Sequence, residues 1–576
     1  MADPSTDVSE PVTETVTQPT VDFSTAPGEY RHWRLAVDGP VATLTLQVDP
    51  AGGLRTDYEL KMNSYDLGVD IELHDAIQRL RFEHPGVKAV VLTGGLERMF
   101  CAGANISMLA GSTHGHKVNF CKFTNETRNS MEDATANSGQ TWIAAVNGTA
   151  AGGGYEMALA CDEILLVDDR SSAVSLPEIP LLAVLPGTGG LTRVVDKRFV
   201  RRDLADAFAT KNEGVRGQTA VDWGLADAIA PASGFDALIA ERSAARAAES
   251  DRPDGGAGVV LEALGRQVDG DRFHYGGPGA VGSVSVALDR ATGTATINLA
   301  APEAPSPKSA DELRTTGSAV WLLATARELD DAALHLRFNE PDIGTWVFTT
   351  TGSAEAVLAA EEVLAAEPDH WLVREVRLLW ARVLKRLDLS ARTLVATVEP
   401  ESAFVGVLAE LVLAADRSYM LAGTWEDLDD PPPPATLRLT EASTGWFPMS
   451  NGLTRLQTRF WGREDALAAA TAVVGKDLTA EDALAAELIT FAPDDLDWED
   501  EIRLMLEERN SFSPDALTAM EANYRFVGPE TMETKIFSRL SAWQNWIFQR
   551  PNAVGPEGAL RRFGTGTRPT FDQNRV

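Results

Sequence analysis

Two glutamates lie near a run of three glycines in the first half of the sequence. Residues 146–166 read VNGTAAGGGYEMALACDEILL and contain Glu156, and residues 175–193 read SLPEIPLLAVLPGTGGLTR and contain Glu178. A glycine-rich turn that opens a helix presents free backbone N–H groups, which suit an oxygen that becomes negative during a reaction. Two carboxylates beside such a turn could supply general acid and base chemistry.

The segments around this turn alternate between strand and helix patterns. VATLTLQV (41–48) alternates like a half-buried strand, and VDIELHDAIQRLRFE (69–83) has apolar residues at helical spacing. VKAVVLTGG and TWIAAVNG are typical of buried strands, FCAGANISML of a loop that enters a helix, and YEMALACDE of a helix that ILLVDD follows as a strand. This alternation predicts an α/β fold.

The pattern starts again after a linker-like stretch, DRPDGGAG near residue 251 and YGGPGA near residue 275. VSVALDRATGTATINL resembles the first strands, the segment 320–352 parallels the segment 69–95, and TLVATV (393–398) parallels TWIAAV (141–146). AELVLAADRSYML places Glu410 opposite Glu156, and TEASTGWFPMSNGLTR places Glu441 opposite Glu178. Matches in the same order along the chain predict a duplicated unit.

The second copy differs where chemistry would occur. EPESAFVGVLAE replaces NGTAAGGGYE, and SAEAVLAAE replaces FCAGANI, so the run of glycines that allows close backbone approach is lost. We expect this copy to be a degenerate scaffold, with Glu410 and Glu441 as structural remnants. The predicted division is a disordered acidic tail (1–27), a catalytic domain (28–270), a degenerate scaffold domain (271–500), and a helical C-terminal region with a tail (501–576).

Composition excludes several classes of protein. The 576 residues carry a net charge of −33, which disfavours nucleic acid and anionic membranes as partners. The N-terminal segment lacks the apolar core of a signal peptide, and no apolar run reaches the ~18 residues of a membrane span. The three cysteines, Cys101, Cys121 and Cys161, are too few for a disulfide framework, so we expect a reducing, cytoplasmic location.

FCAGANI, NGTAAGGGYE and LPEIPLLAVLPGTGGLTR, in this order and spacing, resemble the enoyl-CoA hydratase/isomerase (crotonase) superfamily over residues 35 to 235. The resemblance implies a spiral of ββα turns and an acyl-CoA thioester substrate. It also implies an oxyanion hole formed by the backbone N–H groups of Ala104 and Gly153. Glu156 and Glu178 match the two catalytic glutamates of the superfamily. No cofactor is implied, because CoA is part of the substrate.

The degenerate second copy and the tail look like a narrower group, the ring-cleaving enzymes of benzoyl-CoA degradation. This resemblance implies cleavage of 2,3-epoxy-2,3-dihydrobenzoyl-CoA with two waters, to 3,4-dehydroadipyl-CoA semialdehyde and formate. A simple enoyl-CoA hydratase or isomerase would carry the same motifs and stays an alternative. A non-catalytic scaffold or RNA-binding relative is a second alternative, disfavoured by the net charge. Superfamily members are often oligomers, and a homodimer is expected here.

Other residues are weaker candidates. Cys121, in KVNFCKFTNETR, lies in the segment expected to line the acyl pocket; the ring-cleaving group uses a cysteine here, whereas a buried structural cysteine is the common alternative. The resemblance places four basic residues near the CoA phosphates: Arg55, Lys61, Lys117 and Lys122. Each is equally explained as a solvated surface charge. His114 and His116 lack further ligands at metal-binding spacing, so no metal site is predicted.

Overall fold

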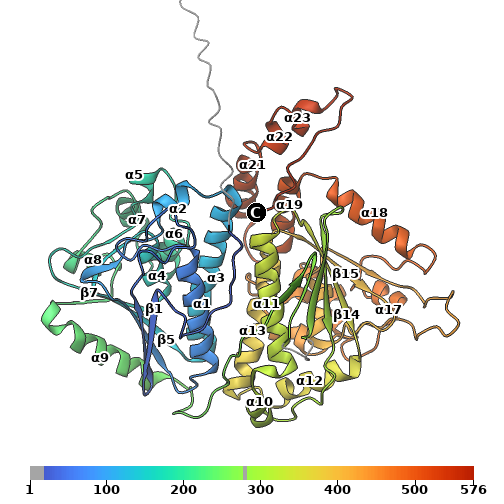
Figure 1. Cartoon of the computed structure of the whole chain (residues 1–576), viewed down its shortest axis with the longest axis horizontal. Coiled ribbons are helices and arrows are strands. Elements are labelled where there is room, and N and C mark those ends of the chain that lie inside the picture. Colours follow the sequence, from blue (N-terminus) through green and yellow to red (C-terminus); the bar gives the residue numbers. More distant parts are fainter. Residues whose placement is uncertain (1–18, 277–281) are drawn as a thin grey trace, which may run out of the picture.

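Each half of the chain folds around its own β-sheet, and long helices from both halves lie side by side between the two sheets (Figure 1). The computed structural model describes residues 19–276 and 282–576. Residues 1–18 of the predicted acidic tail therefore lie outside the described residues. Residues 19–27 do not form a free tail, because Val21 is buried and pairs through its backbone with the side chain of Asn339.

The first half contains a six-stranded sheet with the order β1-β2-β3-β5-β7-β9. Strand β1 is antiparallel to β2, and every following neighbour is parallel. The strands are β1 (Trp33–Asp38), β2 (Val41–Leu46), β3 (Ala89–Gly94), β5 (Thr141–Val146), β7 (Glu163–Val167) and β9 (Ala228–Ala230). The alternation in β2 places Ala42, Leu44 and Leu46 in the core, as the sequence predicts.

The second half repeats this topology. Its seven strands run in the order β10-β11-β12-β13-β14-β15-β16; β12 and β13 are antiparallel, and β13 to β16 are parallel. The strands are β10 (Gln267–Asp269), β11 (Arg272–His274), β12 (Val284–Asp289), β13 (Thr294–Ala300), β14 (Thr345–Thr351), β15 (Thr393–Val398) and β16 (Arg417–Met420). The predicted duplication of a crotonase-like ββα unit is therefore confirmed.

A small second sheet distinguishes the first half. It consists of β4 (Arg98–Cys101), β6 (Gly148–Ala151) and β8 (Val174–Ser175), all parallel. In the second half the described residues keep only isolated bridges at the corresponding places, Val405 with Arg438 and Leu437 with Leu478. The layer that carries the glycine turn is thus ordered as a sheet in only one of the two halves.

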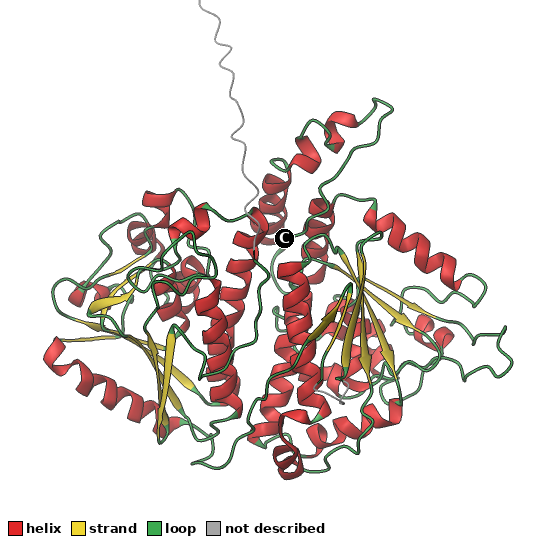
Figure 2. Ribbon diagram, viewed as in Figure 1, coloured by secondary structure: helices red, strands yellow, loops and turns green. Residues whose placement is uncertain are grey.

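Helices fill the space between and around the sheets (Figure 2). Those of the first half are α1 (Leu67–Phe82), α2 (Ile106–Ala110), α3 (His114–Ser138), α4 (Gly153–Ala160), α5 (Glu178–Leu182), α6 (Gly190–Thr192), α7 (Arg202–Ala209), α8 (Gly217–Asp222) and α9 (Ala232–Glu249). Those of the second half are α10 (Ala310–Thr316), α11 (Trp321–Asn339), α12 (Ala354–Ala366), α13 (Trp371–Asp388), α14 (Ala409–Ala414), α15 (Arg455–Arg459), α16 (Glu464–Thr471), α17 (Ala480–Ala485), α18 (Trp498–Asn510) and α19 (Pro514–Arg525).

The junction between the halves is formed by α1 and α3 against α11 and α13. Both halves contain the sequence LRF at the end of the first long helix, and its arginine reaches across the junction in each case. Arg81 pairs with Glu375 at 2.7 Å, and Arg337 pairs with Glu126 at 2.6 Å. Since an unpaired buried charge is costly, these reciprocal pairs fix how the halves meet.

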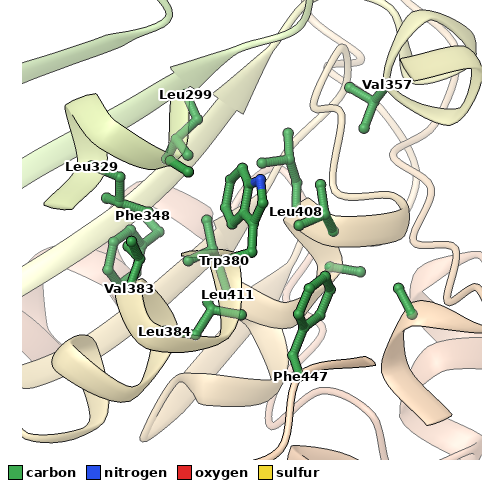
Figure 3. Packing of buried hydrophobic residues seen from close by; sticks show 14 of the residues in the cluster. Leu299, Leu329, Phe348, Val357, Trp380, Val383, Leu384, Leu408, Leu411 and Phe447 are labelled. Carbon is green, nitrogen blue, oxygen red and sulfur yellow. The ribbon is translucent and has the colours of Figure 1, made fainter. Parts of the chain in front are cut away.

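The second half has the larger apolar core. Figure 3 shows part of it, with the indole of Trp380 from α13 packed close to Leu408 and Leu411 beneath the start of α14. On the outer faces, α9 covers the first sheet and α18 covers the second, each through a small apolar cluster. Helix α18 therefore belongs to the second half, and the predicted boundary at residue 500 falls inside it.

The C-terminal region forms a projecting arm (Figure 1). It contains α20 (Met532–Thr534), a π-helical segment (Lys535–Leu540), α21 (Ser541–Ile547), α22 (Pro551–Val554) and α23 (Ala559–Arg562). The last residues return to the junction, where Arg575 and Val576 are buried. Within the described parts of the chain, no helix is both long and apolar enough to cross a membrane.

Candidate active site

The two predicted oxyanion residues follow adjacent strands of the small sheet, Ala104 after β4 and Gly153 after β6, at the start of α4. A Cβ atom on Gly103, whose φ is +85°, would lie 2.7 Å from the carbonyl oxygen of Ala151 and 2.9 Å from the backbone nitrogen of Gly153. Glycine is therefore required for the two segments to approach this closely.

The backbone N–H groups of Ala104 and Gly153 have no recorded acceptor among residues 19–276 and 282–576. Gly153 is the first residue of α4, where N–H groups have no partner within the helix. The neighbouring N–H groups are occupied: Gly152 donates to Ser175 O, and Asn105 donates to Tyr65 O. Two free donors on adjacent segments are the arrangement that an oxyanion hole requires.

Glu156 lies one turn into α4 and is buried, with 2% of its surface exposed. Its carboxylate accepts hydrogen bonds from the backbone N–H of Thr188 (2.9 Å), from the backbone N–H of Gly190 (2.8 Å) and from the hydroxyl of Thr188 (2.5 Å). A Cβ on Gly190 would lie 2.8 Å from Cγ of Glu156. The GTGG segment, residues 187–190, therefore wraps around this carboxylate and fixes its position.

Glu178 is the first residue of α5 and lies against the glycine turn. A Cβ on Gly152 would lie 2.5 Å from Oε1 of Glu178, and Oε2 of Glu178 is buried without a recorded partner in the described residues. Burial, and then the negative charge of Glu156, raises the pKa of Glu178 to about 7. A carboxyl group with this pKa can both take and return a proton near neutral pH.

Cys121 lies on α3 close to the same region. Its Sγ would be 2.9 Å from a Cβ on Gly187, next to the segment that holds Glu156. Burial, and then the charge of Glu156, raises the pKa of the Cys121 thiol to about 11. The group is therefore a neutral thiol at physiological pH rather than a nucleophilic thiolate. Cys101 and Cys161 are fully buried, as expected for core positions.

The four basic candidates do not converge on one point. Arg55 donates to Asp57 (2.8 Å) and to the carbonyl of Gly111 (3.2 Å), and Lys61 forms an exposed pair with Glu59. Lys117 is half-buried near the start of α3. Lys122 is directed to the junction between the halves, where it donates to the carbonyl of Val576 at 2.9 Å. Its ammonium is thus engaged within the chain, and burial shifts its pKa well below the usual value.

The two histidines are separate from this site. His114 stacks on Trp546 of the C-terminal arm, with ring centroids 6.2 Å apart. In the part of the chain that the structure describes, no group of three or more His, Cys, Asp or Glu side chains is arranged to hold a metal ion.

Sequence analysis missed two sets of residues at this site. Thr188 and Gly190 hold Glu156, although the sequence pattern singles out only Glu178 in the segment that contains them. Tyr65, Arg128 and Asp70 form a buried polar network beneath the turn. The available signal is Asp70, a charged residue within the predicted helix 69–83, which a count of apolar residues ignores; no helix is predicted around Arg128.

The fold and the two free donors beside paired carboxylates define the crotonase class of acyl-CoA enzymes. Residues 57–251 match the family model described as enoyl-CoA hydratase/isomerase. A benzoyl-CoA-dihydrodiol lyase of Aromatoleum evansii is 54% identical over 556 residues, covering 96% of this chain and 98% of that protein. The fatty acid oxidation complex subunit alpha of Idiomarina loihiensis is 31% identical over 185 residues, covering 32% of this chain and 25% of that protein.

Among solved structures, an enoyl-CoA hydratase of Geobacillus kaustophilus is 30% identical, with a TM-score of 0.33; the match covers 38% of this chain and 75% of that one. The lyase of A. evansii matches nearly all of this chain. The chain belongs to the benzoyl-CoA-dihydrodiol lyase family of the enoyl-CoA hydratase/isomerase superfamily.

Proposed function

We propose that this protein is a ring-cleaving carbon–carbon lyase of benzoyl-CoA degradation. It converts 2,3-epoxy-2,3-dihydrobenzoyl-CoA and two waters to 3,4-dehydroadipyl-CoA semialdehyde and formate. The observation that carries the proposal is the near full-length match at 54% identity, which includes the second half and the C-terminal arm. The free N–H groups of Ala104 and Gly153 beside an unpartnered carboxyl oxygen of Glu178 support it chemically.

The proposed reaction needs stabilisation of an enolate. One water opens the epoxide to a diol. The bond between the two oxygenated carbons then breaks, its electron pair passes into the ring double bonds and is protonated there, and two aldehydes result after the enol takes its keto form. The second water adds to the aldehyde next to the thioester-bearing carbon. When the hydrated aldehyde loses a proton, its carbon–carbon bond breaks, formate leaves, and the electron pair passes to the thioester-bearing carbon and its carbonyl oxygen. Loss of one preorganised donor to such an oxygen typically costs ~3–4 kcal/mol of barrier.

The two glutamates take different parts in this proposal. Glu178 accepts the proton of the hydrated aldehyde and returns it to the enolate carbon, because its pKa of about 7 suits both transfers. Glu156 accepts three hydrogen bonds from Thr188 and Gly190, so it serves as a fixed negative neighbour that orients water and raises the pKa of Glu178. Water is the only co-reactant needed for balance, and no redox cofactor takes part.

Four further assignments belong to the proposal. Cys121 lines the acyl site as a neutral thiol, and Arg55, Lys61 and Lys117 are the basic residues available to CoA phosphates. The protein acts in the cytoplasm, in keeping with three unpaired cysteines. It is a homodimer, because large side chains of the C-terminal arm are left exposed in the single chain, among them Phe537, Phe548 and Phe563.

A simple enoyl-CoA hydratase is the second candidate, favoured by the family match over residues 57–251 alone. The test supplies 2,3-epoxy-2,3-dihydrobenzoyl-CoA and crotonyl-CoA separately and measures formate release and double-bond hydration. Formate from the epoxide is the expected result. Hydration of crotonyl-CoA with no formate from the epoxide would overturn the ring-cleaving function.

A further inference from the structure

Tyr65 contacts both residues of the proposed oxyanion hole. Its backbone brackets Ala104: Tyr65 N donates to Gly103 O at 3.0 Å, and Asn105 N donates to Tyr65 O at 2.8 Å. Its hydroxyl lies against Gly153, since a Cβ on Gly153 would fall 1.9 Å from the tyrosine oxygen. The distance between the two donor segments therefore depends on where this one side chain lies.

Arg128 of α3 holds the tyrosine in this position. Its Nη2 donates to the hydroxyl of Tyr65 at 3.0 Å and to the carbonyl of Gly153 at 3.4 Å. The guanidinium is completely buried. A cation placed on the carbonyl of Gly153 both anchors the first turn of α4 and polarises the peptide that follows.

Asp70 of α1 anchors the arginine in turn. It pairs with Arg128 at 3.2 Å and accepts a hydrogen bond from the hydroxyl of Thr124 at 2.9 Å. All members of this network are at most 2% exposed. A buried network of this kind carries a desolvation cost that an apolar core avoids, so its position beneath the reacting site calls for a reason other than stability.

The second half shows the apolar alternative at the same place. Strands β5 and β15 both begin with threonine, and Arg128 and Trp380 lie at the same distance before them in α3 and α13. Trp380 packs against Leu408 and Leu411 at the start of α14 (Figure 3). The fold is thus stable with an apolar side chain at the place of Arg128, so the contacts of Arg128 with Tyr65 and Gly153 are a feature of the first half.

We propose that Tyr65, held by Arg128 and Asp70, is a positioning residue that sets the separation of the Ala104 and Gly153 N–H groups. This rests on the proposed function, because it assumes that these two groups bind the thioester oxygen. A shift of ~1 Å in a positioned group costs about 10²-fold in rate, so the effect belongs to kcat rather than to substrate binding.

The test uses Tyr65→Phe, which removes one oxygen atom, and benzoyl-CoA carrying ¹³C at its carbonyl carbon as the bound probe. Infrared difference spectra report how strongly the hole polarises the thioester, through a shift of the carbonyl stretch to lower wavenumber. We expect wild type to give this shift and Tyr65→Phe to lose most of it, with a roughly 10- to 100-fold fall in kcat and little change in KM.

Tyr275→Phe is the matched control. Tyr275 is also a buried tyrosine in an Arg–Asp network, with its hydroxyl 2.8 Å from Asp331 and Arg266 paired to the same carboxylate. It lies in the second half, and its loss is expected to leave the carbonyl shift and kcat unchanged. Arg128→Met and Arg128→Lys extend the test, with partial recovery in the lysine variant.

The outcomes separate two failures. Wild-type protein without a carbonyl shift would overturn the oxyanion hole itself, and with it the proposed chemistry. A full shift and full kcat in Tyr65→Phe, or equal losses in Tyr65→Phe and Tyr275→Phe, would overturn the positioning role while leaving the proposed function standing.

Discussion

The glycine turn of the first half has a counterpart in the second half, and the two turns face different partners. Gly152 and Gly406 have nearly the same positive φ, +52° and +55°, and each precedes the buried glutamate of its half, Glu156 or Glu410. A carboxylate lies against each glycine: a Cβ on Gly152 would meet Glu178, and a Cβ on Gly406 would meet Glu361 of α12.

The difference is in what holds the carboxylate beside the glycine. In the first half the N–H of Gly153 has no recorded acceptor in the described residues, and Oε2 of Glu178 has no recorded donor. In the second half the carboxylate beside the glycine is Glu361, which accepts a hydrogen bond from the hydroxyl of Thr440 at 2.5 Å. The chain itself thus holds the carboxylate beside the second turn but not the one beside the first turn, and we call the second half the closed copy and the first half the open copy.

The buried glutamates differ in the same sense. Glu156 is held by neutral donors, Thr188 and Gly190, whereas Glu410 lies 3.4 Å from Arg455, which also pairs with Asp388 at 2.6 Å. An ion pair therefore balances the charge of Glu410, whereas only neutral donors hold Glu156.

The largest expected effect comes from removing Glu178, the acid–base group of the first half. Glu178→Gln is expected to lower kcat by about 10²–10⁴-fold, because the amide cannot accept the proton of the hydrated aldehyde. Formate release under saturating epoxide measures it. Glu441→Gln is the matched control: its glutamate is the sequence counterpart of Glu178 but is exposed, and turnover should be retained. Equal losses in both variants would show that the wrong carboxylate has been assigned.

The pH profile sharpens this assignment. Glu178 must be deprotonated to act as a base, so kcat/KM should rise with pH through about 7 and then level off. Glu156→Gln removes the neighbouring negative charge, which lowers the pKa of Glu178, and the residual activity should rise at a lower pH than in wild type. If the rise in activity stayed near pH 7 in that variant, the charge of Glu156 would have no influence on the pKa of Glu178.

The next effect concerns how the second half, the closed copy, stabilises the first half. Glu126 lies on α3, the helix that carries Arg128, and pairs with Arg337 and Arg386 of the second half. Glu126→Ala leaves two arginines without their common carboxylate, and the free energy of unfolding should fall by about 3–5 kcal/mol. Denaturant unfolding measures it. Glu487→Ala, which breaks an exposed pair with Arg463, is the control and should leave the transition unchanged.

A smaller loss of stability is expected from removing Glu361, the carboxylate beside the glycine turn of the second half. Glu361→Ala leaves the Thr440 hydroxyl without its acceptor, at a cost of about 1–3 kcal/mol. Glu361→Gln keeps an acceptor oxygen and should cost less. Formate release should be unchanged in both variants. If Glu361→Ala abolished turnover while the protein stayed folded, the second half would take part in the chemistry, and the distinction between open and closed copies would fail.

The sequence predicts the repeated strands, because apolar periodicity is local and occurs in the same order twice. It also predicts Glu156, Glu178 and the two donors, since these lie within short motifs. It does not predict that Glu361, rather than Glu441, fills the space beside Gly406, because the match along the chain pairs Glu441 with Glu178. The position of Glu361 depends on how α12 packs over the second turn. The positions of Lys122 and Val21 likewise depend on contacts between distant segments.

The smallest effect is expected at Cys121. In the closed copy Val373 holds the corresponding place on α13, at the same distance before the paired strand, so this position accepts an apolar side chain. With a pKa of about 11, only about one thiol in 10⁴ is ionised at pH 7. Cys121→Ser and Cys121→Ala should therefore keep kcat within about 5-fold of wild type, since loss of a packing group alone shifts the Gly187 segment only slightly. A 100-fold loss in both variants, with an unchanged melting temperature, would mean that the thiol reacts and that the open copy uses three groups rather than two.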